Sequence, residues 1–204
     1  KLQGANLSEA DLRAGTMIDA NETRGDVVDL TDANLDDAIL EDTKLKRAKM
    51  SRTSIKNANL TRVSMDEVDL TGADLTGANL SSAQLKNANL TGANLANANM
   101  DQARVQGANM QGALLSGVDL TMADLTDAKV SYGTARLAVD VQTALRDHAL
   151  WVDSDGSEGA RADLSGLDLS REDLRHVYLS GANLQECNLS GADLSDGIIE
   201  LIDL

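Results

Sequence analysis

Large apolar residues recur at every fifth position over about half of the chain, from Leu30 to Val130 without a gap. Two residues before each of these centres stands a small residue, usually Ala, and a polar residue lies between them. A period of five fits neither the 3.6 of an α-helix nor the simple alternation of a long strand. Within one unit the centre and the small residue point to the same side, as in a strand, and Gly or Asn often follows at a turn. The pattern therefore predicts short strands joined by corners, so that the chain coils.

The same five-residue pattern occurs in two further phases. At the start of the chain its centres are Leu2, Leu7, Leu12 and Met17. Near the end its centres are Leu164, Leu169, Leu174, Leu179, Leu184, Leu189, Leu194, Ile199 and Leu204. The phase breaks fall at 18–27 and at 131–161, and a short loop or bulge is expected at the first because Glu22 would occupy a centre.

These breaks divide the chain into three predicted domains. Residues 1–130 form a first repeat domain that contains the break at 18–27, residues 131–161 form an insertion, and residues 162–204 form a second repeat block. The pattern does not decide whether the two blocks stack coaxially or are offset. The chain begins inside a repeat and without Met, which suggests a part of a longer protein.

A helical period replaces the five-residue period inside the insertion. Val141, Leu145, His148 and Val152 fall on one stripe, and Asp140 is the expected N-cap. The pattern predicts a helix over 140–152, followed by a polar loop at 153–159. An open coil end exposes unpaired backbone and apolar residues, so the helix is expected to cover apolar surface on the first repeat domain.

The units read A(D/N)LxG or A(D/N)LxN, most clearly from Ala73 to Leu80 and from Ala88 to Leu95. They closely resemble the bacterial pentapeptide-repeat family over about 34 units. The resemblance implies an all-β solenoid, a right-handed quadrilateral β-helix with four units per turn, here interrupted by one short α-helix. It also implies inward centres and no interior cavity. Phe, which is common at the centre in several members, is absent from this chain.

Charged residues offer a test of a coil of twenty residues. Segment 26–42 carries seven acids and no bases, and segment 44–62 carries seven bases and no acids. Stacking at a spacing of twenty pairs Asp32 with Arg52 and Asp42 with Arg62. The remaining expected pairs are Asp29–Lys49, Asp36–Lys56, Lys46–Asp66, Arg47–Glu67 and Lys49–Asp69. A ladder of cross-strand ion pairs explains the basic run better than a nucleic-acid patch does.

Composition excludes several other classes of protein. Proline and phenylalanine are absent, which fits a continuous backbone ladder without aromatic anchors. The single cysteine, Cys187, excludes an internal disulfide framework. No apolar run is long enough for a membrane span and no signal-peptide pattern opens the chain, so the expected location is cytoplasmic. The net charge of −15, concentrated in the last third, disfavours direct nucleic-acid binding.

Few residues qualify as candidate functional residues. We expect no catalytic, cofactor-binding or metal site, because His148 and His176 lack a nucleophile at motif spacing and Cys187 takes an inward position. Exposed apolar residues form the candidate interaction surface: Ile198, Leu201 and Trp151. Ile198 and Leu201 should point outward beside an inward Ile199.

The sequence favours a non-catalytic scaffold or protein–protein interaction module. Its partner would be an unidentified protein or a second copy of the chain bound through a solenoid end, with no cofactor and no membrane. The resemblance adds one alternative, since some pentapeptide-repeat proteins are acidic DNA mimics that bind DNA gyrase or topoisomerase and give quinolone resistance. The net charge fits that alternative, but the basic run and the insertion do not match that subgroup.

Overall fold

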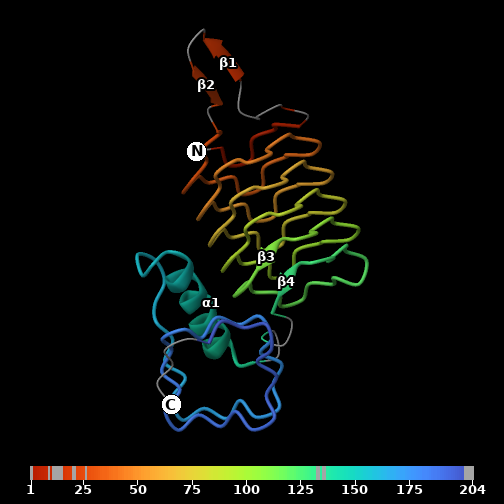
Figure 1. The fold of residues 1–204 in the computed structure, drawn as a ribbon. Coiled ribbons are helices and arrows are strands. Elements are labelled where there is room, and N and C mark those ends of the chain that lie inside the picture. Colours follow the sequence, from red (N-terminus) through yellow and green to blue (C-terminus); the bar gives the residue numbers. More distant parts are fainter. Residues whose placement is uncertain are drawn as a thin grey trace.

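Backbone pairing twenty residues apart organises most of the chain. The computed structural model describes residues 2–8, 10, 16–19, 22–25, 27–131, 134 and 137–199. Parallel bridges join residues twenty apart through the first repeat block (residues 27–131), from Asp29 with Lys49 to Arg104 with Asp124. Leu90 donates its N–H to the Asn109 carbonyl at 2.7 Å, and Asn109 donates to the Ala88 carbonyl at 2.9 Å. The predicted spacing of twenty is confirmed, and Figure 1 shows the resulting stack of coils.

Strands within the coils are short because a corner follows every five residues. Only β3 (Asn109–Met110) and β4 (Lys129–Val130) extend beyond a single bridge within the described coils, and they pair in parallel. Corner residues have a positive φ, whether glycine at Gly72 (64°) or a larger residue at Arg52 (55°). The fold therefore tolerates side chains in this backbone conformation at many corners.

The centres of the five-residue units fill the interior of the first repeat block. From Leu40 to Leu115 the centres are buried together with the small residues two positions before them, whereas Leu30, Leu120 and Leu125 are partly buried. The largest of these buried side chains are Leu35, Leu40, Leu45, Met50, Ile55, Leu60, Met65, Leu70, Leu75, Leu80, Leu85 and Leu90. Where Thr replaces the small residue, its hydroxyl is satisfied inside the coil, as when Thr53 Oγ1 donates to the Leu30 carbonyl at 2.8 Å.

The first phase break contains a β-hairpin, where a short loop or bulge was expected. Strand β1 (Thr16–Asp19) pairs antiparallel with β2 (Glu22–Gly25), and Met17 lies opposite Arg24. Asn6 bridges Ile39, 33 residues away, so the excursion adds 33 − 20 = 13 residues to one coil. The prediction that Met17 is a centre of a coil is therefore wrong, because a two-stranded ladder satisfies its backbone instead. Leu12, the preceding predicted centre, lies outside the described residues.

The insertion forms helix α1 (Val139–Asp153), one residue longer at each end than predicted. The expected N-cap is wrong: Ala138 takes that position without a side-chain cap, and Asp140 lies in the first turn. An acid there still interacts favourably with the helix dipole. Val141, Leu145, His148, Ala149 and Leu150 are its buried residues.

The second repeat block (residues 162–199) repeats the coil on a smaller scale. Bridges join Asp163 with Asn183, Asp168 with Asn188, Asp173 with Asp193 and Tyr178 with Ile198. Its buried core includes Val141 and Leu145 of α1. Figure 1 shows the first block side-on and the second block end-on, with α1 between them, so the coils of the two blocks are offset and not coaxial.

Candidate interaction site

The polar residue before each centre has a structural role at the outer surface. Asp119 Oδ1 accepts hydrogen bonds from the backbone N–H and the hydroxyl of Thr121, at 2.9 and 2.7 Å. These bonds hold the pKa of Asp119 below its usual value. Asn89 makes the same two contacts with Thr91, which explains why either Asp or Asn can occupy the position before a centre. Many of the chain's acids therefore stabilise turns.

Several of the predicted ion pairs form between corner residues of successive coils. Arg52 donates to Asp32 through two nitrogens, at 2.7 and 2.9 Å, and Arg62 binds Asp42 in the same way at 3.0 and 2.8 Å. Arg47 binds Glu67 at 2.7 Å. These contacts raise the pKa of Arg52 and lower the pKa of Asp32, chiefly through the hydrogen bonds. The basic run is thus largely engaged with neighbouring coils.

Two lysines form ion pairs with carboxylates other than those predicted. Lys46 binds Glu67 at 3.2 Å, where Asp66 was expected, and Lys56 Nζ binds Asp74 at 3.2 Å. The Lys56 backbone N–H, rather than its ammonium, donates to Asp36 at 2.9 Å. A flexible lysine side chain can reach a diagonal neighbour on the next coil. The spacing of twenty therefore predicts which coil a lysine contacts, but not which carboxylate of that coil it binds.

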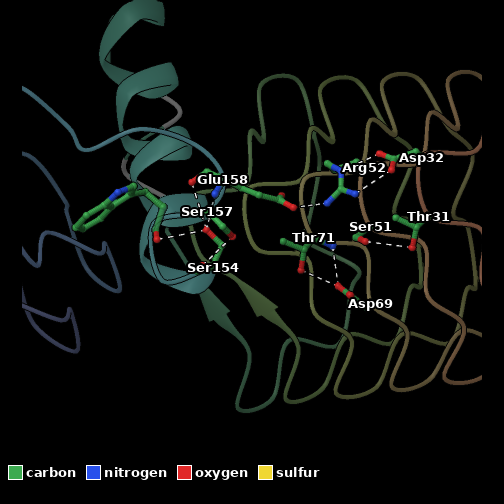
Figure 2. Close-up of polar contacts among 10 residues, drawn as sticks. Thr31, Asp32, Ser51, Arg52, Asp69, Thr71, Ser154, Ser157 and Glu158 are labelled. Atoms are coloured by element: carbon green, nitrogen blue, oxygen red, sulfur yellow. Dashed lines mark hydrogen bonds and ion pairs between the residues drawn. The ribbon is translucent and has the colours of Figure 1, made fainter.

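Arg52 also joins the first repeat block to the loop that follows α1. Figure 2 shows its guanidinium between Asp32 on one side and Glu158 on the other. Ser154 and Ser157 stiffen this loop, because Ser154 Oγ accepts the Glu158 N–H at 2.8 Å and Ser157 Oγ donates to the Ser154 carbonyl at 2.9 Å. The contact between Arg52 and Glu158 spans 106 residues of sequence, and the five-residue pattern does not predict it.

Helix α1 docks on a column of corner glycines. A Cβ at Gly112 would lie 2.5 Å from Ala149 Cβ, and one at Gly92 would lie 2.7 Å from Leu150 Cγ. Arg146 Nε donates to the Gly92 carbonyl at 2.9 Å. The expected docking of the helix on the first block is found, but the surface it covers is mainly backbone and small residues. Gly72, Gly92 and Gly112, twenty apart, are the sequence signal that identifies this corner.

A junction forms where the first block, α1 and the second block meet. Gln111 Nε2 donates to the His176 carbonyl at 2.7 Å, which joins the two blocks directly. His148 Nδ1 accepts the Ala162 N–H at 3.1 Å, which joins the helix to the second block. Among the described residues, Gln111 Oε1, Ser131 Oγ and His148 Nε2 are buried without a hydrogen-bond partner. The buried polar atoms of the junction are therefore less completely hydrogen-bonded than those of the coils.

The predicted interaction residues lie in different places. Trp151 is half-buried at the junction, stacked on His148 with ring centroids 5.6 Å apart. Ile198 is 41% exposed at the far end of the second block, and Leu201 lies outside the described residues. Ile199 is 37% exposed, although its phase predicts an inward position. The structure does not bring Trp151 and Ile198 into one patch, and their role in binding stays a prediction.

A polar groove that the sequence did not predict lies on the uncovered side of the first repeat block. Its volume is about 510 Å³, and it is lined by Asp42, Arg62, Ser82, Gln84, Gln102, Arg104, Met122 and Asp124. A second hollow of about 310 Å³ shares Gln84 and Arg104 with it. Met122 is 66% exposed, and no ion pair joins Arg104 to another described residue. The groove thus offers a guanidinium and several amides to a polar partner.

Cys187 was expected at an inward position of the second repeat block. Cys187 is half-buried rather than buried, and burial raises the pKa of its thiol, which disfavours the reactive thiolate. Within the described ranges, no cluster of three or more His, Cys, Asp or Glu side chains could hold a metal ion. No helix in this part of the chain is long and apolar enough to cross a membrane.

Comparisons with known proteins agree with the coiled architecture. A family model described as pentapeptide repeats matches in eight copies, over residues 28–62, 53–92, 93–131 and 160–196. No curated protein sequence matches significantly.

Similar solved structures include three pentapeptide-repeat relatives of different origin. A pentapeptide repeat protein of the Arabidopsis thaliana thylakoid lumen is 28% identical, with 57% of this chain and 72% of that chain covered, at a TM-score of 0.41. HetL of Nostoc sp. strain PCC 7120, involved in heterocyst differentiation regulation, is 27% identical over 96% of this chain and 81% of its own, at a TM-score of 0.32. QnrB1, a plasmid-mediated fluoroquinolone resistance protein, is 18% identical over 69% and 81%, at a TM-score of 0.31.

Proposed function

The chain belongs to the pentapeptide-repeat family, and we propose that it is a non-catalytic scaffold that presents a rigid polar face to a protein partner. The family consists of structural and interaction modules. We also propose for it the right-handed, four-sided β-helix of that family. The coil of twenty residues supports this geometry, because it equals four units of five.

The single observation that carries the proposal is the uncovered groove around Arg104. Its lining side chains come from successive coils and keep the spacing of the backbone ladder. Gln84 and Arg104 are themselves bridged across coils, and Gln106 Nε2 donates to Asp124 at 2.5 Å. A backbone held in this way loses little conformational entropy when a partner binds. A guanidinium among amides fits a partner that supplies a carboxylate and backbone carbonyls.

The gyrase-binding alternative has weaker support in the structure. Asp32 and Asp42 are neutralised by arginines of the next coil, and Asp119 is occupied with its own turn. A DNA mimic needs a continuous run of free negative charge along its surface. The mixed charge of the first repeat block favours the scaffold.

Affinity capture with a charge-reversed variant tests the scaffold proposal. We expect the wild-type chain to retain a protein partner from host extract, and Arg104→Glu to reduce its recovery by about tenfold. Arg171→Glu, an exposed arginine of the second block, is the matched control and should retain the partner. Recovery that Arg104→Glu leaves unchanged would contradict the proposed surface. Inhibition of gyrase supercoiling by the purified chain would instead support the DNA-mimic alternative.

A further inference from the structure

His148 is the one imidazole buried at the junction. Its side chain is 0% exposed, and its ring stacks on Trp151 at an interplanar angle of 12°. Nδ1 accepts the backbone N–H of Ala162, the residue at which the core of the second block begins. An accepting Nδ1 assigns the proton of the neutral ring to Nε2. The observed contact therefore requires the neutral form of His148.

A second proton would reverse the chemistry of this contact. It would bind Nδ1 and turn the acceptor into a donor that faces another donor, the Ala162 N–H. The imidazolium would also be a buried charge, and the guanidinium of Arg161, directly before the second block, has the same sign and acts on the ring. Burial is the main cause that lowers the pKa of His148, and the neighbouring backbone of Ser180 opposes it.

The remaining charged groups of the junction are accounted for by other contacts. On α1, Asp147 pairs with Arg146 at 3.2 Å, and in the following loop Glu158 pairs with Arg52. Asp153 faces the first block beside Asn89 and Asp69, where burial raises the pKa of its carboxyl. On the second block, burial raises the pKa of Tyr178. Among the described residues, none of these side chains supplies a carboxylate contact to His148.

We propose that His148 is an acid-sensitive latch: protonation at Nδ1 breaks its bond to Ala162 and releases helix α1 from the second repeat block. The coils themselves are unaffected, because their ladders join backbone peptide groups, which do not titrate in this range. The latch thus frees α1 from the second block, while the bond from Gln111 Nε2 to the His176 carbonyl remains as the direct contact between the blocks.

The direction of the pH effect follows from the bound form. The folded junction holds neutral His148. The stability that this residue contributes is therefore fully present above the ordinary histidine pKa of 6.5 and decreases as the pH drops below that value. The turn aspartates have lowered pKa values, so the stability that they contribute is lost only below their ordinary value of 3.8. Protonation of Asp153 acts in the opposite sense, since the pKa of its carboxyl is raised in the folded state. The latch therefore opens as the pH falls below 6.5.

Trp151 is the only tryptophan and reports on the latch directly. We expect acrylamide quenching of its fluorescence to increase at least twofold between pH 7.5 and 4.5, while the far-UV circular dichroism of the coils stays constant. His148→Gln keeps an acceptor but does not titrate, and its quenching should stay constant. His176→Asn removes the other imidazole and should behave like the wild type. Constant quenching in the wild type, or an equal increase in His148→Gln, would overturn the proposal.

A second measurement needs no change at position 148. In His176→Asn a single imidazole remains, and its NMR titration should have a midpoint below 6.5 and move the Ala162 amide and the Trp151 indole resonances together with it. A midpoint at or above 6.5, or an Ala162 amide that does not respond, would overturn the latch even if His148→Gln fails to fold.

Discussion

Replacing Gly112 with Ala is expected to lower the free energy of unfolding by about 3 kcal/mol, because the new methyl group occupies the space of helix α1. Its Cβ would lie 2.5 Å from Ala149 Cβ and 3.4 Å from Arg146 Cα. Both neighbours belong to the helix, so the clash is relieved only if α1 moves away from the first repeat block. Urea unfolding, followed by circular dichroism, measures the loss.

Gly166→Ala is the matched control for the backbone conformation. Gly166 has a φ of 68°, against 66° for Gly112, but a Cβ there would meet nothing within 4 Å. The control should cost about 1 kcal/mol, the penalty of a left-handed alanine alone. Equal losses in the two variants would show that the helix does not rest on Gly112.

Leu90→Ala is expected to lower the free energy of unfolding by about 3 to 5 kcal/mol, through lost burial and the cavity it leaves. Leu90 is completely buried among centres and small residues of the first block. Its backbone is bonded to Asn109 of the next coil, which limits collapse into the cavity. The same urea titration measures this effect.

Ile39→Ala provides the contrast within the same block. Ile39 is 39% exposed at the position between a small residue and a centre, where its side chain points outward. Its replacement should cost less than about 1 kcal/mol. A small effect of Leu90→Ala, or a large effect of Ile39→Ala, would contradict the assignment of inward and outward positions.

The repeat made the coils predictable because the residue types within each unit indicate which positions point inward, which point outward and which form the turn. A residue such as Leu90 must be inside, Asn89 must be outside, and Gly92 must turn, so local pattern and long-range pairing agree. Charge provided an independent check, since Arg52 and Asp32 have opposite signs twenty residues apart. The length of the helix was predictable to one residue at each end for the same reason, because its period is local.

Features that depend on contacts outside the repeat were not predictable. The hairpin at Thr16–Gly25 has no apolar alternation strong enough to distinguish it from a loop. The bond between Arg52 and Glu158 depends on where the insertion returns to the coil. The groove around Arg104 is lined by side chains that match no motif in the sequence and come together only when the coils are stacked. The docking corner was readable in principle from Gly72, Gly92 and Gly112.

A distance measurement between the two repeat blocks tests the rigidity on which the proposed scaffold rests, since α1 packs against both blocks. Spin labels at Lys86→Cys and Ser190→Cys, both exposed positions, can be introduced in a Cys187→Ala background, since Ala is the usual residue at that place in the repeat. Double electron–electron resonance at pH 7.5 should give a single narrow distance distribution. A broad or multiple distribution would show that the blocks move independently and would contradict the rigid scaffold.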